Sequence, residues 1–350
     1  MEDSPPPFTP RAEAPPQTKS SGNIGYIVVL LLVALVAGIF GVMLGARVGG
    51  ASSTAPEGFQ EVLIDGETTA QQKIAAIPIN GVIMESMGTG GSVSQVKKTL
   101  RALKKDESVM GILLIIDTPG GGVTASDRIY HELLEFKRET KLPIHSLFLD
   151  VAASGGYYVA MASDHITAHP TTVTGSIGVI SKFFNFSEAM DKVGISVNVV
   201  KSLNSKGEVS FKDMGSPYRP MRPEERELLQ GLITEMWERF TEVVAAGREN
   251  KLSLEEVRKL ADGRVFTGKQ ALELKLVDSV GYSEEAYAKI REAAGAENAK
   301  IVSYRKEPGL AEMLGLSSEL APPESARLAS LRNLLREQTG FLYLWSAGGL

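Results

Sequence analysis

The amino-acid sequence predicts an α/β domain in which parallel strands alternate with helices, followed by a helical C-terminal region. Two apolar runs of strand length, residues 110–116 and 143–149, each end at a glycine-rich turn. Such continuous runs are expected for strands that are covered on both faces of a sheet. Stretches with apolar residues three and four positions apart follow these runs and predict helices. Strands and helices in alternation favour parallel pairing of the strands.

The domain, which we place at residues 72–304, opens with this alternation. Residues 73–84 predict a strand and a turn, and residues 92–105 predict a helix with a basic outer face. The next expected elements are a strand at 110–116, a helix at 124–140, a strand at 143–149, a short helix at 156–162 and a strand at 166–169. These elements form the predicted sheet and its covering helices.

The second half of the domain is predicted to be mainly helical. Residues 196–200 alternate like a strand, and residues 223–250 form a long amphipathic helix with proline in its first turn. Ser253 and Thr267 each begin a capping box, which marks two further helix starts. Residues 305–350 form a C-terminal extension with an amphipathic piece at 325–337. Its apolar end, residues 341–345, is expected to dock on a neighbour.

The N-terminal residues predict a membrane anchor. Residues 1–23, rich in proline and polar side chains, predict a disordered cytoplasmic tail. Residues 24–46 carry no charge, and about twenty apolar residues at about 1.5 Å each cross a hydrocarbon core of about 30 Å. The run is longer than the roughly 7 to 15 residues of a signal-peptide core. An uncleaved transmembrane helix is therefore favoured over a signal peptide, and cleavage stays open.

Charge and composition narrow the class of protein further. Arg11 and Lys19 precede the apolar run and Arg47 follows it, a weak bias that places the bulk of the chain outside the cytoplasm. Residues 47–71, rich in Gly, Ala, Ser and Thr, predict a linker. The 37 basic and 42 acidic residues give a net charge of -5, which argues against a nucleic-acid partner. The absence of cysteine excludes disulfides, thiolate metal sites and a cysteine nucleophile.

One serine stands where a nucleophile is useful. Ser154 lies among small residues in the segment Asp-Val-Ala-Ala-Ser-Gly-Gly, where a predicted strand gives way to a helix. Its hydroxyl is uncrowded there, and the Gly155 amide could donate a hydrogen bond to an oxyanion. The alternative is a serine that only caps the helix N-terminus.

A second glycine-rich turn, residues 119–122, also ends a buried strand. Loops at the carboxyl ends of neighbouring parallel strands gather into one crevice. Ser154 and the bare amides of both turns would then make a nucleophile with a two-donor oxyanion hole. Neither a G-x-G-x-x-G pattern nor a P-loop with its lysine is present, so we expect no nucleotide cofactor and no other cofactor or metal.

Such a serine requires a base. His165 and His169 follow Ser154 closely, and a structural or solvent-facing role is the simpler reading of both. The other option is a lysine whose pKa is lowered from about 10.4 by burial. The candidates after the serine turn are Lys182, Lys192, Lys201, Lys206 and Lys212, for each of which a solvated surface charge is the default.

Five sequence motifs then resemble one protease family. They are residues 116–122 (Ile-Asp-Thr-Pro-Gly-Gly-Gly), 150–158 (Asp-Val-Ala-Ala-Ser-Gly-Gly-Tyr-Tyr), 174–180 (Thr-Gly-Ser-Ile-Gly-Val-Ile), 211–221 (Phe-Lys-Asp-Met-Gly-Ser-Pro-Tyr-Arg-Pro-Met) and 262–268 (Asp-Gly-Arg-Val-Phe-Thr-Gly). Their order over residues 72–300 resembles bacterial signal peptide peptidase A in its short, single-repeat form. The resemblance implies the Clp/crotonase-like fold of repeated ββα units.

The resemblance assigns roles to individual residues. Ser154 matches the nucleophile and Lys212 the general base of a Ser/Lys dyad, with Lys206 as the base if the alignment shifts. Ser176 matches a hydroxyl that orients the lysine amine. Gly121 and Gly155 match the oxyanion donors, with Gly120 as a near neighbour that stays open. The related Clp subunit uses a histidine near residues 176–180, where this chain has none.

The family implies a serine endopeptidase anchored in the bacterial inner membrane by a single span, with its catalytic domain on the extracytoplasmic side. Its implied substrates are signal-peptide remnants, and its implied assembly is a homo-oligomeric ring. The alternatives are a protease of the same fold acting on other membrane proteins and a membrane-tethered scaffold without activity. A crotonase-type acyl-CoA enzyme would gain nothing from a membrane anchor.

Overall fold

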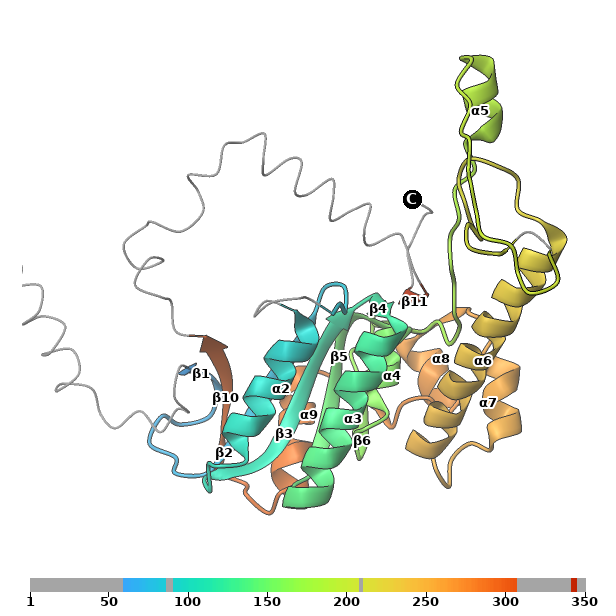
Figure 1. Ribbon diagram of the computed structural model, residues 1–350. Helices are drawn as coiled ribbons and strands as arrows, with labels where there is room; N and C mark the ends of the chain where they lie inside the picture. The colour runs from blue at the N-terminus through green and yellow to red at the C-terminus, as the bar shows by residue number, and fades with distance from the viewer. Residues whose placement is uncertain (1–58, 86–90, 208–209, 307–340, 345–350) are drawn as a thin grey trace, which may run out of the picture. The chain divides into compact units, whose positions relative to one another are not determined.

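A computed structural model describes residues 59–85, 91–207, 210–306 and 341–344 (Figure 1). The predicted tail at 1–23 and the predicted membrane anchor at 24–46 lie outside the described residues. Within the described ranges, no helix is both long and apolar enough to span a membrane.

The described residues form a mixed sheet of nine strands and a separate two-stranded pair. The strands are β1 (Phe59–Asp65), β2 (Lys73–Asn80), β3 (Val109–Thr118), β4 (Gly120–Gly122), β5 (Ile144–Ala153), β6 (His165–Ala168), β7 (Val173–Gly175), β8 (Val265–Thr267), β9 (Ser279–Val280), β10 (Lys300–Lys306) and β11 (Leu342–Leu344). The main order is β1-β10-β2-β3-β5-β6-β9, and β7 pairs with both β5 and β8. From β10 to β9 every neighbouring pair is parallel, whereas β1–β10 and β7–β8 are antiparallel.

Helices cover both faces of this sheet. They are α2 (Ser92–Leu103), α3 (Val123–Thr140), α4 (Gly155–Ala160), α5 (Ser187–Lys192), α6 (Pro223–Gly247), α7 (Leu254–Leu260), α8 (Gly268–Glu273) and α9 (Ser283–Ala293). Successive strand residues point to opposite faces. In β3, Ile112 and Leu114 therefore join the core under α2 and α3, whereas Leu113 joins the core under Ile290 of α9. Figure 1 shows α2 and α3 side by side over the sheet.

The predicted elements of the first half are confirmed, with bounds that differ by a few residues. The largest difference is β5, predicted to end at Leu149, which continues to Ala153. Its last residues pair with β7, with Val151 opposite Val173. The strand therefore leads directly into the serine turn. Ser253 and Thr267 begin α7 and α8 with the capping boxes that the sequence predicted.

Two segments differ from the predictions. Part of the predicted linker, Phe59–Asp65, is the edge strand β1, which pairs with β10. The predicted strand at 196–200 is wrong, because these residues form no strand and all are exposed. Alternation alone does not make a strand, since the backbone also needs a neighbouring strand to bond.

A buried histidine pair lies between β5 and β6. The rings of His145 and His165 are 5.3 Å apart, and the His145 Nδ1 has no hydrogen-bond partner in the described structure. Burial, helped by the neighbouring His165, lowers the pKa of His145 to about 4. Burial also lowers the pKa of His165. Both rings are therefore neutral at pH 7 in the folded protein.

This pair predicts an acid-dependent loss of stability. Because the unfolded chain binds the His145 proton near pH 6.5 and the folded chain only near pH 4, the free energy of unfolding falls as the pH drops through that window. The gap corresponds to about 3 kcal/mol. Urea unfolding at pH 7, 6 and 5 measures it. We expect His145→Gln to flatten the dependence, and His131→Gln, at an exposed position, to leave it unchanged. Equal slopes in wild type and His145→Gln would contradict the assignment.

Candidate active site

Ser154 stands at the junction of β5 and α4 in a strained conformation. Its φ of 54° and ψ of -113° lie outside the regions that a serine ordinarily occupies, at a cost of about 1–3 kcal/mol. The conformation is held by an amide hydrogen bond of 2.8 Å to the Gly175 carbonyl of β7 and by the Ser154 carbonyl, which accepts from the Tyr158 amide. Strand pairing on one side and the helix on the other thus fix the backbone of Ser154.

The alternative interpretation, that Ser154 only caps the helix, is wrong, because its side chain makes no capping hydrogen bond to α4. Only 1% of the residue is exposed, and its Oγ has no hydrogen-bond partner among the described residues. A buried hydroxyl without a partner loses its solvation with no compensation, so such groups are uncommon unless the site uses them. Strain and an unpaired hydroxyl at one residue indicate a functional role.

The glycine turn that follows β3 lies against the serine turn. Gly120 has a φ of 101°, and a Cβ added there would come within 2.6 Å of the Gly155 amide nitrogen. A Cβ added to Gly155 would lie 3.1 Å from the Gly121 nitrogen and 2.5 Å from Ser126 Oγ. The two turns therefore touch backbone to backbone, and only glycine fits between them. The structure brings the predicted donors, Gly121 and Gly155, beside one another.

The direction of the Gly121 amide follows from its neighbours. Gly120 accepts from the Ile83 amide, and the Gly122 amide donates to the Ile83 carbonyl, both at 2.8 Å. Successive peptide groups of an extended chain point to opposite sides. The Gly121 N–H is therefore directed away from Ile83, toward the side on which β11 lies.

Ser176 lies directly after β7 and beside this turn. It follows Gly175, the residue that accepts from the Ser154 amide, and it also has a positive φ, of 50°. Its amide donates to the Arg264 carbonyl at 2.8 Å, and the residue is buried. Ser154 and Ser176 thus stand at the ends of two paired parallel strands.

The structure does not bring the predicted base to the serine. Lys212 and Lys206 are both exposed, and neither is bonded to Ser154, whose hydroxyl has no partner within the described residues. Both lysines lie between β7 and α6, in residues 181–222, which we call the arm. All of residues 191–200 in it are exposed. Within one chain, Ser154 and Lys212 therefore form no hydrogen bond with each other.

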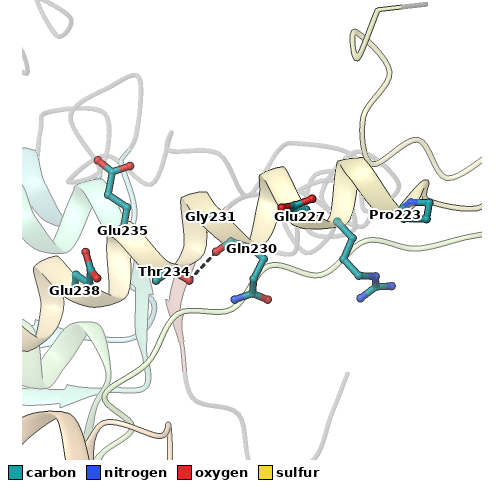
Figure 2. Close-up of a pocket in the computed structure, with 8 residues that line it drawn as sticks. Pro223, Glu227, Gln230, Gly231, Thr234, Glu235 and Glu238 are labelled. Carbon is teal, nitrogen blue, oxygen red and sulfur yellow. Dashed lines mark hydrogen bonds between the residues drawn. The ribbon is translucent and has the colours of Figure 1, made fainter.

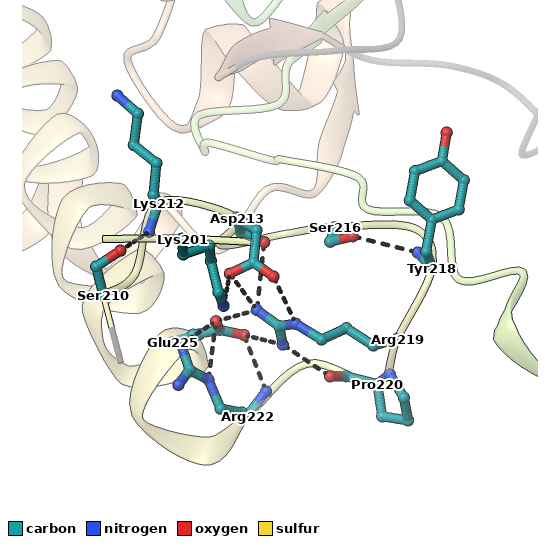
Figure 3. A network of polar contacts seen from close by, with 10 residues as sticks. All are labelled: Lys201, Ser210, Lys212, Asp213, Ser216, Tyr218, Arg219, Pro220, Arg222 and Glu225. Carbon is teal, nitrogen blue, oxygen red and sulfur yellow. Dashed lines mark hydrogen bonds and ion pairs between the residues drawn. The ribbon is translucent and has the colours of Figure 1, made fainter. Parts of the chain in front are cut away.

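An ionic network fixes the base of the arm (Figure 3). Asp213 accepts hydrogen bonds from Arg219 at 3.0 Å and from Lys201 at 2.5 Å. Glu225, fully buried in the first turn of α6, binds both Arg219 and Arg222. Arg219, then Lys201, lowers the pKa of Asp213, and Arg219 lowers the pKa of Glu225 to about 2. Figure 3 shows the Lys212 side chain projecting away from this network.

A surface hollow of about 660 Å³ lies elsewhere, along α6 between Pro223 and Glu238 (Figure 2). The residues that line it all belong to that one helix, and none is a predicted site residue. The hollow therefore takes no part in the candidate active site. No group of three or more His, Asp or Glu side chains that could hold a metal ion occurs in the part of the chain that the structure describes.

Sequence reasoning missed the two backbone segments that pair with the glycine turn and with β11. Ile83 pairs with Gly121, and Ile180 pairs with Leu342 of the C-terminal strand β11. These pairings join residues far apart in the chain, so no local pattern marks them. The apolar end at 341–345 was the one available signal. It was predicted to dock on a neighbour, whereas the structure pairs its residues 342–344, as β11, with β4 of the same chain.

Comparison with known proteins identifies the family of this chain. The sequence model of Peptidase family S49 matches residues 136–297, and that of Clp protease matches residues 76–173. The chain is 34% identical to a signal peptide peptidase SppA of Enterococcus faecium, over 71% of each chain. The chain belongs to peptidase family S49.

Other S49 relatives include a protease of Synechocystis, 39% identical over 67% of this chain and 79% of that one. The chloroplastic serine protease SPPA of Arabidopsis thaliana is 33% identical over 65% of this chain and 33% of that one. The fold of this S49 member is thus a Clp-protease-like α/β fold with a mixed sheet, and its family is one of serine proteases.

The ionic network of this S49 protein predicts that Glu225 holds the arm in place. We expect Glu225→Gln to speed limited proteolysis within residues 181–222 by about tenfold or more, because two guanidinium groups lose a buried charged acceptor. The measurement is the rate of fragment formation under a short protease pulse. Glu224→Gln, at the exposed neighbouring position, is the matched control. Equal rates for the two variants would show that the network does not order the arm.

Proposed function

We propose that this protein is a membrane-anchored serine endopeptidase with a Ser154/Lys212 dyad that cleaves remnant signal peptides and similar membrane-derived peptides. The observation that carries the proposal is the serine turn. A strained residue presents a buried, unpaired hydroxyl beside two glycine turns whose backbones touch. This arrangement serves acyl transfer, in which a nucleophile and backbone donors act on one carbonyl.

The first half of the reaction forms an acyl-enzyme. Lys212, as the neutral amine, accepts the Ser154 proton while Oγ attacks the peptide carbonyl carbon. The Gly121 and Gly155 amides hold the oxyanion, and each of these donors contributes about 2.7–4 kcal/mol to lowering the barrier. The tetrahedral intermediate then collapses, the C–N bond breaks and the lysine ammonium returns its proton to the leaving amine.

The second half releases the new carboxyl end. Lys212 takes a proton from water as the water oxygen attacks the ester carbonyl, and the same two amides stabilise the second oxyanion. Lys212 then protonates Ser154 Oγ as the ester bond breaks, which restores the starting state. Ser176 is suited to orient the lysine amine because it is buried and directly follows β7, the strand that pairs with the end of β5 next to Ser154.

We infer that the base reaches Ser154 from a second copy of the chain. Lys212 is exposed on the arm and is not bonded to the serine, whereas Lys201 is already paired with Asp213. The arm also exposes a dense set of large apolar side chains: Phe183, Phe184, Phe186, Val193, Ile195, Val197, Val199, Val200, Leu203 and Phe211. Such a surface is unfavourable in water and typical of an interface. We infer that copies of the chain assemble through their arms, so that the Lys212 of one copy meets the Ser154 of another.

A ring satisfies this requirement. An interface in which the arm of one copy covers the serine turn of the next is heterologous, and such an interface forms a ring when the rotation from copy to copy closes. The anchor predicted at residues 24–46 would hold the ring on the bacterial inner membrane, with the catalytic domain on the extracytoplasmic side. Membrane-derived peptides would then reach the cleft, and relatives named signal peptide peptidase support that substrate class.

The first test is loss of activity with retention of fold. We expect Ser154→Ala and Lys212→Ala each to lower peptide cleavage by about 10³-fold or more, because nucleophile and base act as a unit. Lys206→Ala, which removes another exposed lysine of the arm, should keep activity. The measurement is hydrolysis of a signal-peptide-derived substrate, with circular dichroism as the control for folding. The reverse result for the two lysines would assign the base to Lys206.

A covalent probe separates this proposal from its alternatives. A serine-directed fluorophosphonate should label Ser154 in wild type and fail to label Ser154→Ala. Absence of labelling would favour the membrane-tethered scaffold. Labelling together with cleavage of intact membrane proteins, and not of signal peptides, would favour a protease of the same fold with other substrates.

The second test asks whether the dyad spans two copies. Ser154→Ala and Lys212→Ala are each inactive, but co-expressed they can form sites with serine from one variant and lysine from the other. If the subunits mix randomly, about a quarter of the sites are intact, so about a quarter of wild-type activity should return. A mixture as inactive as its components would show that both residues act within one chain.

A further inference from the structure

Thr118, the last residue of β3, lies between the two turns of the candidate active site. The residue is completely buried and stands opposite Ala152 in the pairing of β3 with β5, two positions before Ser154. A position that only fills the core would be occupied as well by valine, which has the same shape. The hydroxyl of Thr118 therefore has a purpose other than packing.

This hydroxyl joins the turn after β2 to the turn after β3. Thr118 Oγ1 accepts a hydrogen bond from the Gly120 amide at 3.0 Å and donates one to the Gly81 carbonyl. The Gly120 carbonyl is a more distant acceptor, at 3.4 Å. The Gly81 amide in turn donates to the Asp117 carbonyl at 3.1 Å. The buried hydroxyl thus both donates and accepts, and it satisfies a backbone group in each turn.

The hydrogen bond to the Gly120 amide helps to fix the direction of the Gly121 N–H. Gly120 has a φ of 101°, and glycine has no side chain that would hold the backbone in one conformation. The Gly120 amide is held by Thr118, and the Gly120 carbonyl by the Ile83 amide at 2.8 Å. In a planar trans peptide the N–H points opposite to the carbonyl, so the orientation of the Gly120 carbonyl sets that of the Gly121 N–H. Without the hydroxyl, one of the two bonds that hold Gly120 is lost.

The methyl group of Thr118 contacts the serine turn instead. A Cβ added to Gly156, the second residue of α4, would lie 2.5 Å from Thr118 Cγ2. The hydroxyl of this one side chain therefore bonds the turn that carries Gly121, and its methyl group packs against the turn that carries Ser154. Removing the two groups separately should have different effects.

We infer that Thr118 is a positioning residue of the oxyanion hole, whose hydroxyl orients Gly120 and thereby holds the Gly121 N–H in place for the oxyanion. This inference rests on the proposed function, in which Gly121 and Gly155 donate to that oxygen. A donor that is already oriented stabilises the developing charge with no reorganisation at the moment of reaction. Because Thr118 acts through the backbone, loss of its hydroxyl should slow the chemical step and leave substrate binding unchanged.

Thr118→Val, which keeps the shape and removes the hydroxyl, tests this inference. We expect kcat for peptide cleavage to fall by about 10- to 100-fold with KM unchanged, less than the roughly 10²–10³-fold cost of deleting an oxyanion donor. Thr118→Ser keeps the hydroxyl and should keep kcat. The matched control is Thr172→Val, which should also keep kcat. Thr172 is equally buried and donates to the Leu149 carbonyl, which belongs to neither turn.

A pair of inhibitors separates positioning from a purely structural role. Ser154 Oγ adds to the carbonyl carbon of a peptide aldehyde, its proton passes to the base, and the aldehyde oxygen becomes an oxyanion in the hole. The corresponding peptide alcohol binds the same cleft and forms no adduct. We expect Thr118→Val to weaken the aldehyde by the factor by which kcat falls and to leave the alcohol unchanged. Equal weakening of both inhibitors, or of neither, would overturn the inference.

Circular dichroism and thermal unfolding check the fold of each variant. If Thr118→Val does not fold, Thr118→Ala is compared with Thr118→Ser, because both lack the methyl group and differ only in the hydroxyl. The preference for aldehyde over alcohol should fall in the alanine variant alone, and equal preferences would contradict the inference. A wild type that cleaves peptides, with Thr118→Val equally active, refutes only the inference. A wild type that is neither labelled at Ser154 nor active refutes the proposed function.

Discussion

The geometry of the site depends on the pairing of β5 with β7. This pairing extends β5 beyond its apolar run as far as Ala153. The hydrogen bond from the Ser154 amide to the Gly175 carbonyl continues the pairing at the next residue. Beyond that point the chain must turn into α4 at once, and the turn forces Ser154 into its strained conformation. The strain is maintained because sheet and helix are both buried and cannot relax independently.

That constraint explains why the surrounding residues are small. The serine hydroxyl becomes useful only if a substrate carbonyl can approach the backbone closely, and the two glycine turns meet with no space for a methyl group between them. Ser126 contributes to this packing, because its Oγ occupies the place that a side chain at residue 155 would need. The glycines are therefore required by the packing that surrounds them as well as by the chemistry.

Local pattern predicted four neighbouring strands of the nine-stranded sheet, β2, β3, β5 and β6, and the position of the serine turn, since strand and helix periods and glycine clusters are local properties. It did not predict that β5 reaches Ala153, because Asp150 interrupts the apolar run while the strand continues by pairing with β7. Nor could it place Lys212, which lies on an arm whose apolar residues are exposed in the single chain. Residues 196–200 alternate like a strand but form none, because alternation produces a strand only where a partner strand is available for hydrogen bonding.

The C-terminal strand β11 pairs with an edge of β4 that would otherwise have no strand partner. A cleft that binds peptides through backbone hydrogen bonds must leave a strand edge unpaired, and an unpaired edge accepts any extended chain nearby. In this protein the nearby chain is its own C-terminal segment, which supplies a backbone for the edge and the ring of Tyr343, stacked on Tyr158. Occupation protects the edge while no substrate is bound.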